Sequence, residues 1–148
     1  MNKTFRALAL SACLSAVAAT AQAATATAVF AGGCFWCIEA DFEKLAGVTE
    51  VESGYTAGKT ANPTYEQVSN GHTGHTEAVR VIYDPARVSY AQLVDYFWRH
   101  IDPTVKDRQF CDIGSQYRSG IYWGSPAERQ VVEASRDALL KSGRFKAI

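Results

Sequence analysis

The sequence is poor in several features that mark large classes of protein. Its 148 residues include 4 prolines and a single methionine, and they carry 15 basic and 15 acidic side chains. Balanced charge without clustered Lys or Arg excludes a typical nucleic-acid surface, so we expect no nucleic-acid partner. A hydrophobic content of 47% argues against an intrinsically disordered chain. The length, without internal repeats, predicts one globular domain with enough apolar residues to bury a core.

The one long apolar run lies at the N-terminus. Met1–Arg6 is short and basic, and Ala7–Ala21 is apolar apart from three hydroxyl residues. Ala21-Gln22-Ala23 then has the A-x-A form of a cleavage site. The arrangement predicts a secretory signal peptide over residues 1–23, because a permanent transmembrane helix would need a longer clean apolar run.

Export would place residues 24–148 in the periplasm or outside the cell, where disulfides persist. A lipoprotein anchored through Cys13 is the alternative, although the apolar stretch before it is short. Beyond the leader three cysteines remain, Cys34, Cys37 and Cys111. Because their number is odd, at least one thiol must be free, metal-bound or engaged in exchange.

Hydrophobic periodicity and turn signals predict seven elements after the leader. They are a strand over Ala28–Ala31, a helix from Cys34 to Gly47, a strand over Val48–Ser53, a strand over Thr76–Tyr83, a helix from Ser89 to Ile101, a strand over Arg118–Trp123 and a helix from Ser125 to about Gly143. Residues 54–74 and 102–116 are expected to be loops, the first with one helical turn at Thr64–Val68. The order predicts an α+β two-layer sandwich, with helices on one face of a mainly antiparallel (mixed) sheet and a split βαβ, ferredoxin-like core.

Gly32-Gly33-Cys34-Phe35-Trp36-Cys37 is the most informative stretch. The glycines end a strand, so Cys34 falls at or beside a helix N-terminus, where unpaired N–H groups and the helix dipole stabilise a thiolate. A thiolate is the nucleophilic form of cysteine. Phe35 and Trp36 indicate an apolar pocket beside it, and Cys37 is near enough to form a disulfide with Cys34 after modest adjustment.

The same cysteines allow other interpretations. A Cys3His zinc site could add His72, His75 or His100, although the second half lacks knuckle-like spacing. Cys34 and Cys37 could also form a passive structural disulfide, or the dithiol of a thioredoxin-like oxidoreductase, which is the main rival. Against that rival, a thioredoxin-like domain needs parallel βαβ units and a proline facing the dithiol, whereas the prolines here are expected in loops or at a helix start.

Glu77 is the second candidate for chemistry. In the predicted strand its side chain shares a face with Val79, Val81 and Tyr83. It therefore points either into the core or a cleft, or reaches water at the end of an edge strand, and the alternation leaves both open. Burial would raise the pKa of this carboxyl and keep it protonated near neutral pH, as a general acid or hydrogen-bond donor requires.

Six motifs follow one another along the chain. They are Gly32-Gly33-Cys34-Phe35-Trp36, Gly54-Tyr55, Asn62-Pro63-Thr64-Tyr65-Glu66, Gly74-His75-Thr76-Glu77-Ala78-Val79, Asp107-Arg108-Gln109 and Gln116-Tyr117-Arg118-Ser119. In these motifs the sequence resembles the A-type peptide methionine sulfoxide reductases, from about Val29 to its end. The resemblance implies an α+β thiol-dependent oxidoreductase that reduces methionine-S-sulfoxide, free or in proteins, to methionine.

The resemblance also implies roles for individual residues. Cys34 would be the nucleophile, Phe35 and Trp36 would line the pocket for the terminal methyl group of the substrate, and Glu77 would be the acid that activates the sulfoxide oxygen. Tyr65 and Tyr117 would donate hydrogen bonds to that oxygen, and Asp112 would help to orient the site.

Turnover would convert Cys34 to a sulfenic acid and then to a disulfide, which a thioredoxin-like donor would reduce, so we expect no bound cofactor and no metal. Many members of the family lack a cysteine at the position of Cys37 and resolve the sulfenic acid from a C-terminal tail. We interpret Cys37 as the resolving thiol and Cys111 as a second, relaying thiol. Because the family continues with a further strand and a tail, we interpret residues 24–148 as a single catalytic domain truncated at its C-terminus, and we expect a monomer.

Overall fold

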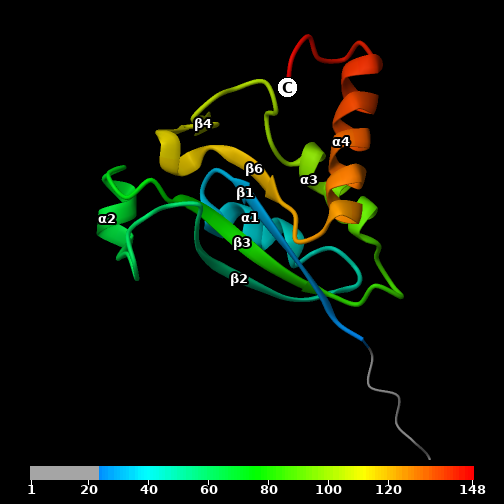
Figure 1. The fold of residues 1–148 in the computed structure, drawn as a ribbon, viewed down its shortest axis with the longest axis horizontal. Coiled ribbons are helices and arrows are strands. Elements are labelled where there is room, and N and C mark those ends of the chain that lie inside the picture. Colours follow the sequence, from blue (N-terminus) through cyan, green and yellow to red (C-terminus); the bar gives the residue numbers. More distant parts are fainter. Residues whose placement is uncertain (1–23) are drawn as a thin grey trace, which may run out of the picture.

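The structure is a computed structural model that describes residues 24–148, so the expected signal peptide and Cys13 lie outside the described residues. Its elements, drawn in Figure 1, follow in chain order: β1 (Ala26–Gly32), α1 (Phe35–Phe42), β2 (Val48–Thr56), α2 (Tyr65–Ser69), β3 (Thr76–Tyr83), α3 (Tyr90–Arg99), β4 (Arg108–Gln109), β5 (Asp112–Ile113), the 3-10 helix η1 (Ser115–Tyr117), β6 (Ser119–Tyr122) and α4 (Pro126–Lys141). No helix in this part of the chain is both long and apolar enough to cross a bilayer.

The main sheet has the strand order β2-β3-β1-β6, and each neighbouring pair is antiparallel. β3 lies between β1 and β2, so the unit β1-α1-β2 is a split βαβ, and the expected ferredoxin-like core is confirmed. The parallel neighbours that a thioredoxin-like domain requires are missing from this sheet. The fold therefore argues against the main rival interpretation of the two neighbouring cysteines.

The core lies between the sheet and the helices α1 and α3. Phe30 of β1 is completely buried, and its ring centroid lies 4.8 Å from that of Phe42 in α1 and 5.1 Å from that of Phe97 in α3. One side chain of the sheet thus touches both helices, so both cover the same face. Each buried ring stabilises the fold by about 1.5–3 kcal/mol. Figure 1 shows α4 beside α3, outside this layer, where the Trp98 indole donates to Ser135 Oγ at 3.0 Å.

Capping boxes begin α2 and α3. Ser89 accepts from the backbone N–H of Gln92, whose side chain accepts from the N–H of Ser89, and Thr64 forms the same capping box at α2. α1 is shorter than expected, since it ends at Phe42 rather than near Gly47. Gly47 instead turns the chain into β2 with φ +101°, at a place where a Cβ atom would lie 2.7 Å from a Val88 methyl carbon.

The prediction of a plain loop over residues 102–116 is wrong in part. β4 and β5 pair as a hairpin, with Gln109 opposite Asp112, and η1 follows. Two-residue strands carry no hydrophobic alternation, so periodicity cannot reveal them. What holds the hairpin is the buried Gln109 side chain, which donates to Asp102 O and Ser119 Oγ, both at 2.7 Å, and accepts from Asp102 N at 2.8 Å.

Candidate active site

Cys34 caps the N-terminus of α1, as its sequence position predicts. Its carbonyl oxygen accepts the first helical hydrogen bonds, from Cys37 N at 3.1 Å and Ile38 N at 3.3 Å. Gly33 aims the chain into this position with φ +93°, and a Cβ atom there would lie 2.6 Å from Cβ of Gln109. The nucleophile candidate therefore sits at the positive end of a helix dipole, on a turn that packs directly against the β4–β5 hairpin.

Glu77 points into the protein, which settles the question that the alternation left open. Its side chain is 1% exposed, and Oε2 accepts a hydrogen bond of 3.0 Å from the backbone N–H of Phe35, the residue after Cys34. Burial raises the pKa of the Glu77 carboxyl above its ordinary value, the bond from Phe35 opposes this, and the negative charge of Asp112 adds to it. The Glu77 carboxyl group, whose pKa is raised, thus bonds to the backbone of the residue that follows Cys34.

Four aromatic rings form an open shelf around these groups. Phe35 is buried, and its ring centroid lies 5.5 Å from Trp36 and 6.2 Å from Tyr65. The rings of Trp36 and Tyr65 stack at 6.1 Å with planes 13° apart, yet Trp36 remains 62% exposed. Tyr55, which the sequence did not single out as a site residue, pairs with Glu77 across β2 and β3 and lies 5.7 Å from Phe35. The sequence signal that could have identified Tyr55 is its place in the motif Gly54-Tyr55.

Tyr117 and Asp112 join the site from the segment between β4 and β6. Tyr117 ends η1, and burial raises the pKa of its hydroxyl first, with Glu77 as the next cause and Asp112 and Cys34 among the later ones. Asp112 is the first residue of β5, and its negative charge raises the pKa values of Glu77 and Cys37. Tyr117 and Asp112 therefore belong to the electrostatic surroundings of Glu77 and the two neighbouring cysteines.

The three cysteines are free thiols, so the structure contains no disulfide among them. Loss of hydration raises the pKa of the Cys37 thiol, and a hydrogen bond with Cys34 and the negative charge of Cys34 raise it further. Cys37 lies in the first turn of α1, whose N-cap is Cys34. Cys111 is exposed and lies in the turn between β4 and β5, beside Gln109, which packs on Gly33.

Two of the three histidines contact backbone carbonyl oxygens rather than the cysteines. His75 Nε2 is 2.8 Å from Thr60 O and so ties the loop before β3, while His100 Nδ1 is 2.7 Å from Tyr96 O at the end of α3. Within residues 24–148, no three His, Cys, Asp or Glu side chains gather in a group that could hold a metal ion. The alternative zinc site therefore has no ligand set in the described part of the chain.

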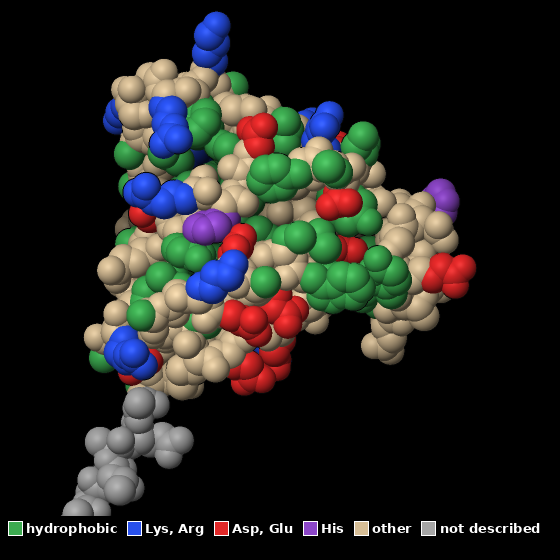
Figure 2. Space-filling view, turned by 180° about the vertical axis from the view of Figure 1, so that it is seen from behind, with side chains coloured by type: hydrophobic (Ala, Val, Ile, Leu, Met, Phe, Trp, Pro, Cys, Tyr) green, Lys and Arg blue, Asp and Glu red, His purple; other side chains and the backbone are tan. Residues whose placement is uncertain are grey.

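Large apolar side chains are exposed around the site. Trp36 and Tyr65 are 62% and 51% exposed, and Phe110 and Ile113 of the β4–β5 hairpin are 68% and 71% exposed. Figure 2 shows hydrophobic side chains gathered on the surface next to the lobe formed by α2, with an acidic cluster below them. The shelf is thus open to solvent and accessible to a bulky substrate such as a protein segment.

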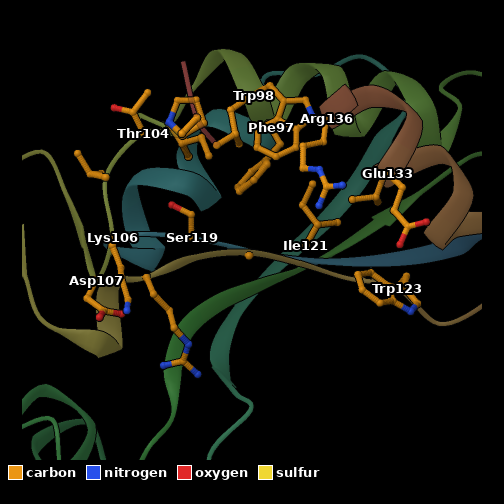
Figure 3. Close-up of a pocket in the computed structure, with 18 residues that line it drawn as sticks. Phe97, Trp98, Thr104, Lys106, Asp107, Ser119, Ile121, Trp123, Glu133 and Arg136 are labelled. Carbon is orange, nitrogen blue, oxygen red and sulfur yellow. The ribbon is translucent and has the colours of Figure 1, made fainter. Parts of the chain in front are cut away.

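A cavity of about 610 Å³ lies away from Cys34 and the aromatic shelf. It is bounded by α3, α4, β6 and residues 103–107, and Figure 3 shows Trp98, Ile121 and Trp123 pointing toward it. No cysteine and none of the predicted site residues line it. Volume alone would place a binding site here, but the cavity holds no nucleophile, so we assign the site by its chemistry, at Cys34.

Comparison with known proteins points to one family. Residues 26–148 match the family described as "Peptide methionine sulfoxide reductase". The chain is 51% identical over 119 residues to "Peptide methionine sulfoxide reductase MsrA" of Limosilactobacillus reuteri, a match that covers 80% of this chain and 68% of that protein.

Solved structures agree with the sequence comparison. "Methionine sulfoxide reductase A of Corynebacterium diphtheriae" superposes with a TM-score of 0.72 at 38% identity and covers 82% of this chain, which spans 61% of that one. A complex of Mxr1 from Saccharomyces cerevisiae with Trx2 matches with a TM-score of 0.57 over 80% of this chain and 68% of that one, and at 21% identity it shares the fold.

Proposed function

Because the chain belongs to the peptide methionine sulfoxide reductase family, we propose that it reduces methionine-S-sulfoxide, free or in proteins, to methionine. The observation that carries the proposal is the link between Cys34 and Glu77. A cysteine at a helix N-terminus and a buried carboxyl group meet through the 3.0 Å bond to Phe35 N, beside an aromatic shelf. Attack on a sulfoxide needs these three parts: a thiolate, a proton donor for the oxygen, and an apolar surface for the methyl group.

The first half of the reaction consumes the sulfoxide. The methyl group lies against Trp36 and Phe35, and the oxygen faces Glu77, Tyr65 and Tyr117. Glu77 gives its proton to that oxygen, which makes the sulfur electrophilic, and the Cys34 thiolate attacks it. The sulfur–oxygen bond of the substrate breaks, methionine leaves, and Cys34 becomes a sulfenic acid. The substrate sulfur gains two electrons and Cys34 loses them, so the step balances.

The second half makes a disulfide, and Cys37 is its first partner. Cys37 attacks the sulfur of Cys34, and the oxygen leaves as water with the proton of Cys37. Two of the causes that raise the pKa of Cys37 are its hydrogen bond to Cys34 and the charge on Cys34. The charge is lost when Cys34 becomes a neutral sulfenic acid, so Cys37 deprotonates more easily once it has to react. Cys111 then relays by thiol–disulfide exchange.

A thioredoxin-like protein supplies the two electrons that restore the thiols, so the enzyme needs no bound cofactor. The Mxr1 structure with Trx2 supports this partner, and the exposed apolar side chains beside the cysteines suit protein contact. Asp112 supports the site as a charge rather than as a reacting group.

We also propose that the protein is exported, with residues 1–23 as its signal peptide, on the sequence features of that segment. Residues 24–148 would then be its catalytic domain, and we propose a monomer without nucleic-acid partners.

A coupled assay tests the proposed function. NADPH consumption is followed with thioredoxin, thioredoxin reductase and separated sulfoxide epimers. Consumption with the S epimer, little with the R epimer and none with Cys34→Ser supports the proposal. Insulin reduction at rates above sulfoxide reduction would favour a general thiol–disulfide oxidoreductase instead.

Disulfide mapping tests the order of the thiols. After one equivalent of sulfoxide, free thiols are blocked with an alkylating reagent and the peptides are sequenced by mass spectrometry. We expect a Cys34–Cys37 bond in the first sample and the same bond in Cys111→Ser. A first bond from Cys34 to Cys111 would reverse the assignment.

A further inference from the structure

The three groups assigned to the sulfoxide oxygen come from three separate elements. Tyr65 begins α2, Glu77 is the second residue of β3, and Tyr117 ends η1. The structure records no hydrogen bond between any two of these side chains among the described residues. Their spacing must therefore be set by the backbone segments that carry them, so the contacts between those segments decide whether the oxygen meets all three.

Gln116 contacts all three segments. It precedes Tyr117, and its carbonyl oxygen accepts a hydrogen bond of 2.9 Å from the hydroxyl of Thr76, the residue before Glu77. Its side-chain Nε2 donates at 2.9 Å to the carbonyl oxygen of Ser69, the last residue of α2. Thr76 is completely buried and Gln116 is 8% exposed, so water does not replace these bonds readily.

The Gln116 side chain packs closely against the neighbouring backbone. It lies in a slot between two glycines: a Cβ atom at Gly114 would come within 2.3 Å of its Oε1, and one at Gly71 within 3.4 Å. Arg118 joins η1 to the residues just before β3, since its guanidinium donates to Ser115 O at 2.7 Å and to Gly74 O at 3.1 Å. The segment that carries Tyr117 is therefore fastened both to the start of β3 and to α2.

We infer that Thr76 and Gln116 are positioning residues, which hold the acid Glu77 and the tyrosines Tyr65 and Tyr117 at the spacing that one sulfoxide oxygen requires. The inference rests on the proposed function. Neither residue touches the reacting atoms; each acts through the neighbour that it fixes. Displacement of a reacting group by about 1 Å costs on the order of 100-fold in rate, so loss of either bond should slow the chemical step far more than it weakens binding.

Thr76→Val is the sharpest test, because it keeps the shape of the side chain and removes the donor. Thr76→Ser keeps the hydroxyl and is the rescue variant. Thr49→Val is a control at an exposed position: Thr49 also donates to a carbonyl oxygen in the same sheet, Ile82 O at 3.1 Å, but lies on β2 at the opposite end from Glu77. Gln116→Met is a second variant, which removes the bond to Ser69 at similar length.

Methionine release is measured in single turnovers over a range of substrate concentrations up to saturation, between pH 5 and 9, on protein shown by near-ultraviolet circular dichroism to be folded. We expect Thr76→Val and Gln116→Met to lose roughly 10- to 100-fold in the rate constant. KM should change much less, and Thr76→Ser and Thr49→Val should remain near the wild type. In the slow variants the fall of the rate with rising pH should begin at lower pH, because water that reaches Glu77 lowers its pKa; a loss of stability alone would not move it.

The outcomes separate the two claims. A Thr76→Val enzyme at nearly the wild-type rate and with an unchanged pH profile overturns the inference, as does an equal loss in Thr76→Ser. If Thr76→Val does not fold, Gln116→Met decides by the same criteria. A wild-type protein that releases no methionine refutes the proposed function itself, whereas an active wild type with unaffected variants refutes the positioning role alone.

Discussion

Replacement of Glu77 by glutamine tests the acid at the centre of the site. The amide has the same shape, and its oxygen can still accept the 3.0 Å hydrogen bond from Phe35 N, so the start of α1 should stay in place. What the change removes is a proton that can be transferred. Glu77→Gln therefore separates the chemical role of the carboxyl group from its structural role.

The expected loss follows from general acid catalysis. A positioned acid contributes about 10²- to 10⁴-fold to a rate, or about 2.7–5.4 kcal/mol of transition-state stabilisation. We expect the single-turnover rate of methionine release to fall within that range, while substrate binding against Trp36 and Phe35 changes little. The wild-type rate should also fall as the pH rises through the raised pKa of Glu77, and the variant should lose that dependence.

The same substitution should increase stability at neutral and alkaline pH. Burial raises the pKa of Glu77 above its ordinary value of 4.5, so the folded protein binds this proton more tightly than the unfolded chain. The stability that Glu77 contributes is fully present below the unfolded pKa and is lost as the pH rises through the folded pKa. Each unit of difference costs about 1.4 kcal/mol above both values. Glutamine does not titrate, so the variant escapes this cost.

Two assays together check this reasoning. Rapid-quench measurement of methionine gives the rate, and urea unfolding at pH 4 and pH 8 gives the free energy of unfolding of both proteins. The stability advantage of Glu77→Gln should be larger at pH 8 than at pH 4. A variant within threefold of the wild-type rate would refute the acid role, and a stability difference independent of pH would refute the raised pKa.

Three further substitutions probe the charge, the turn and the core. Asp112→Asn removes a negative charge that raises the pKa values of Glu77 and Cys37, so the alkaline limb of the pH–rate profile should move to lower pH. Gly33→Ala puts a Cβ atom 2.6 Å from Gln109 Cβ at φ +93°, and urea unfolding should show a loss of about 2–5 kcal/mol together with reduced activity. Leu93→Ala empties a completely buried position in α3 and should cost about 2–5 kcal/mol by the same measurement, with the activity per folded molecule unchanged.

The elements that the sequence predicted best are those with strong local signals. The bounds of β3 agree to the residue, because Thr76–Tyr83 is rich in β-branched residues and Asp84-Pro85 ends the strand. α3 begins where the Ser89 capping box places it. The β4–β5 hairpin has no comparable signal, since its turn residues, Phe110 and Cys111, are not typical of turns, and Phe110 adopts φ +48°.

The site was predictable in part, and the limit has a physical cause. Chemistry marks Cys34 and Glu77, because a cysteine after two glycines and a carboxylate among valines are unusual in themselves. The direction of Glu77 depends on what covers the end of β3, and that cover is α1, far away in the sequence. Gln116 looks like a solvated loop residue until Ser69 and Thr76 are seen beside it, so its role comes from tertiary contacts alone.

The two groups that we propose as proton donors, Glu77 and Cys37, both have raised pKa values. Reduction of a sulfoxide by a thiolate and a thiol needs two protons in all, one for each half of the reaction, and releases one water. Loss of hydration is the first cause that raises the pKa values of both Glu77 and Cys37, and the charge of Asp112 adds to both. Both shifts favour the protonated forms of the two groups to which the proposed reaction assigns these protons. The charge of Cys34 is among the causes that raise the pKa of Cys37, so its loss in the first half of the reaction favours release of the Cys37 proton in the second.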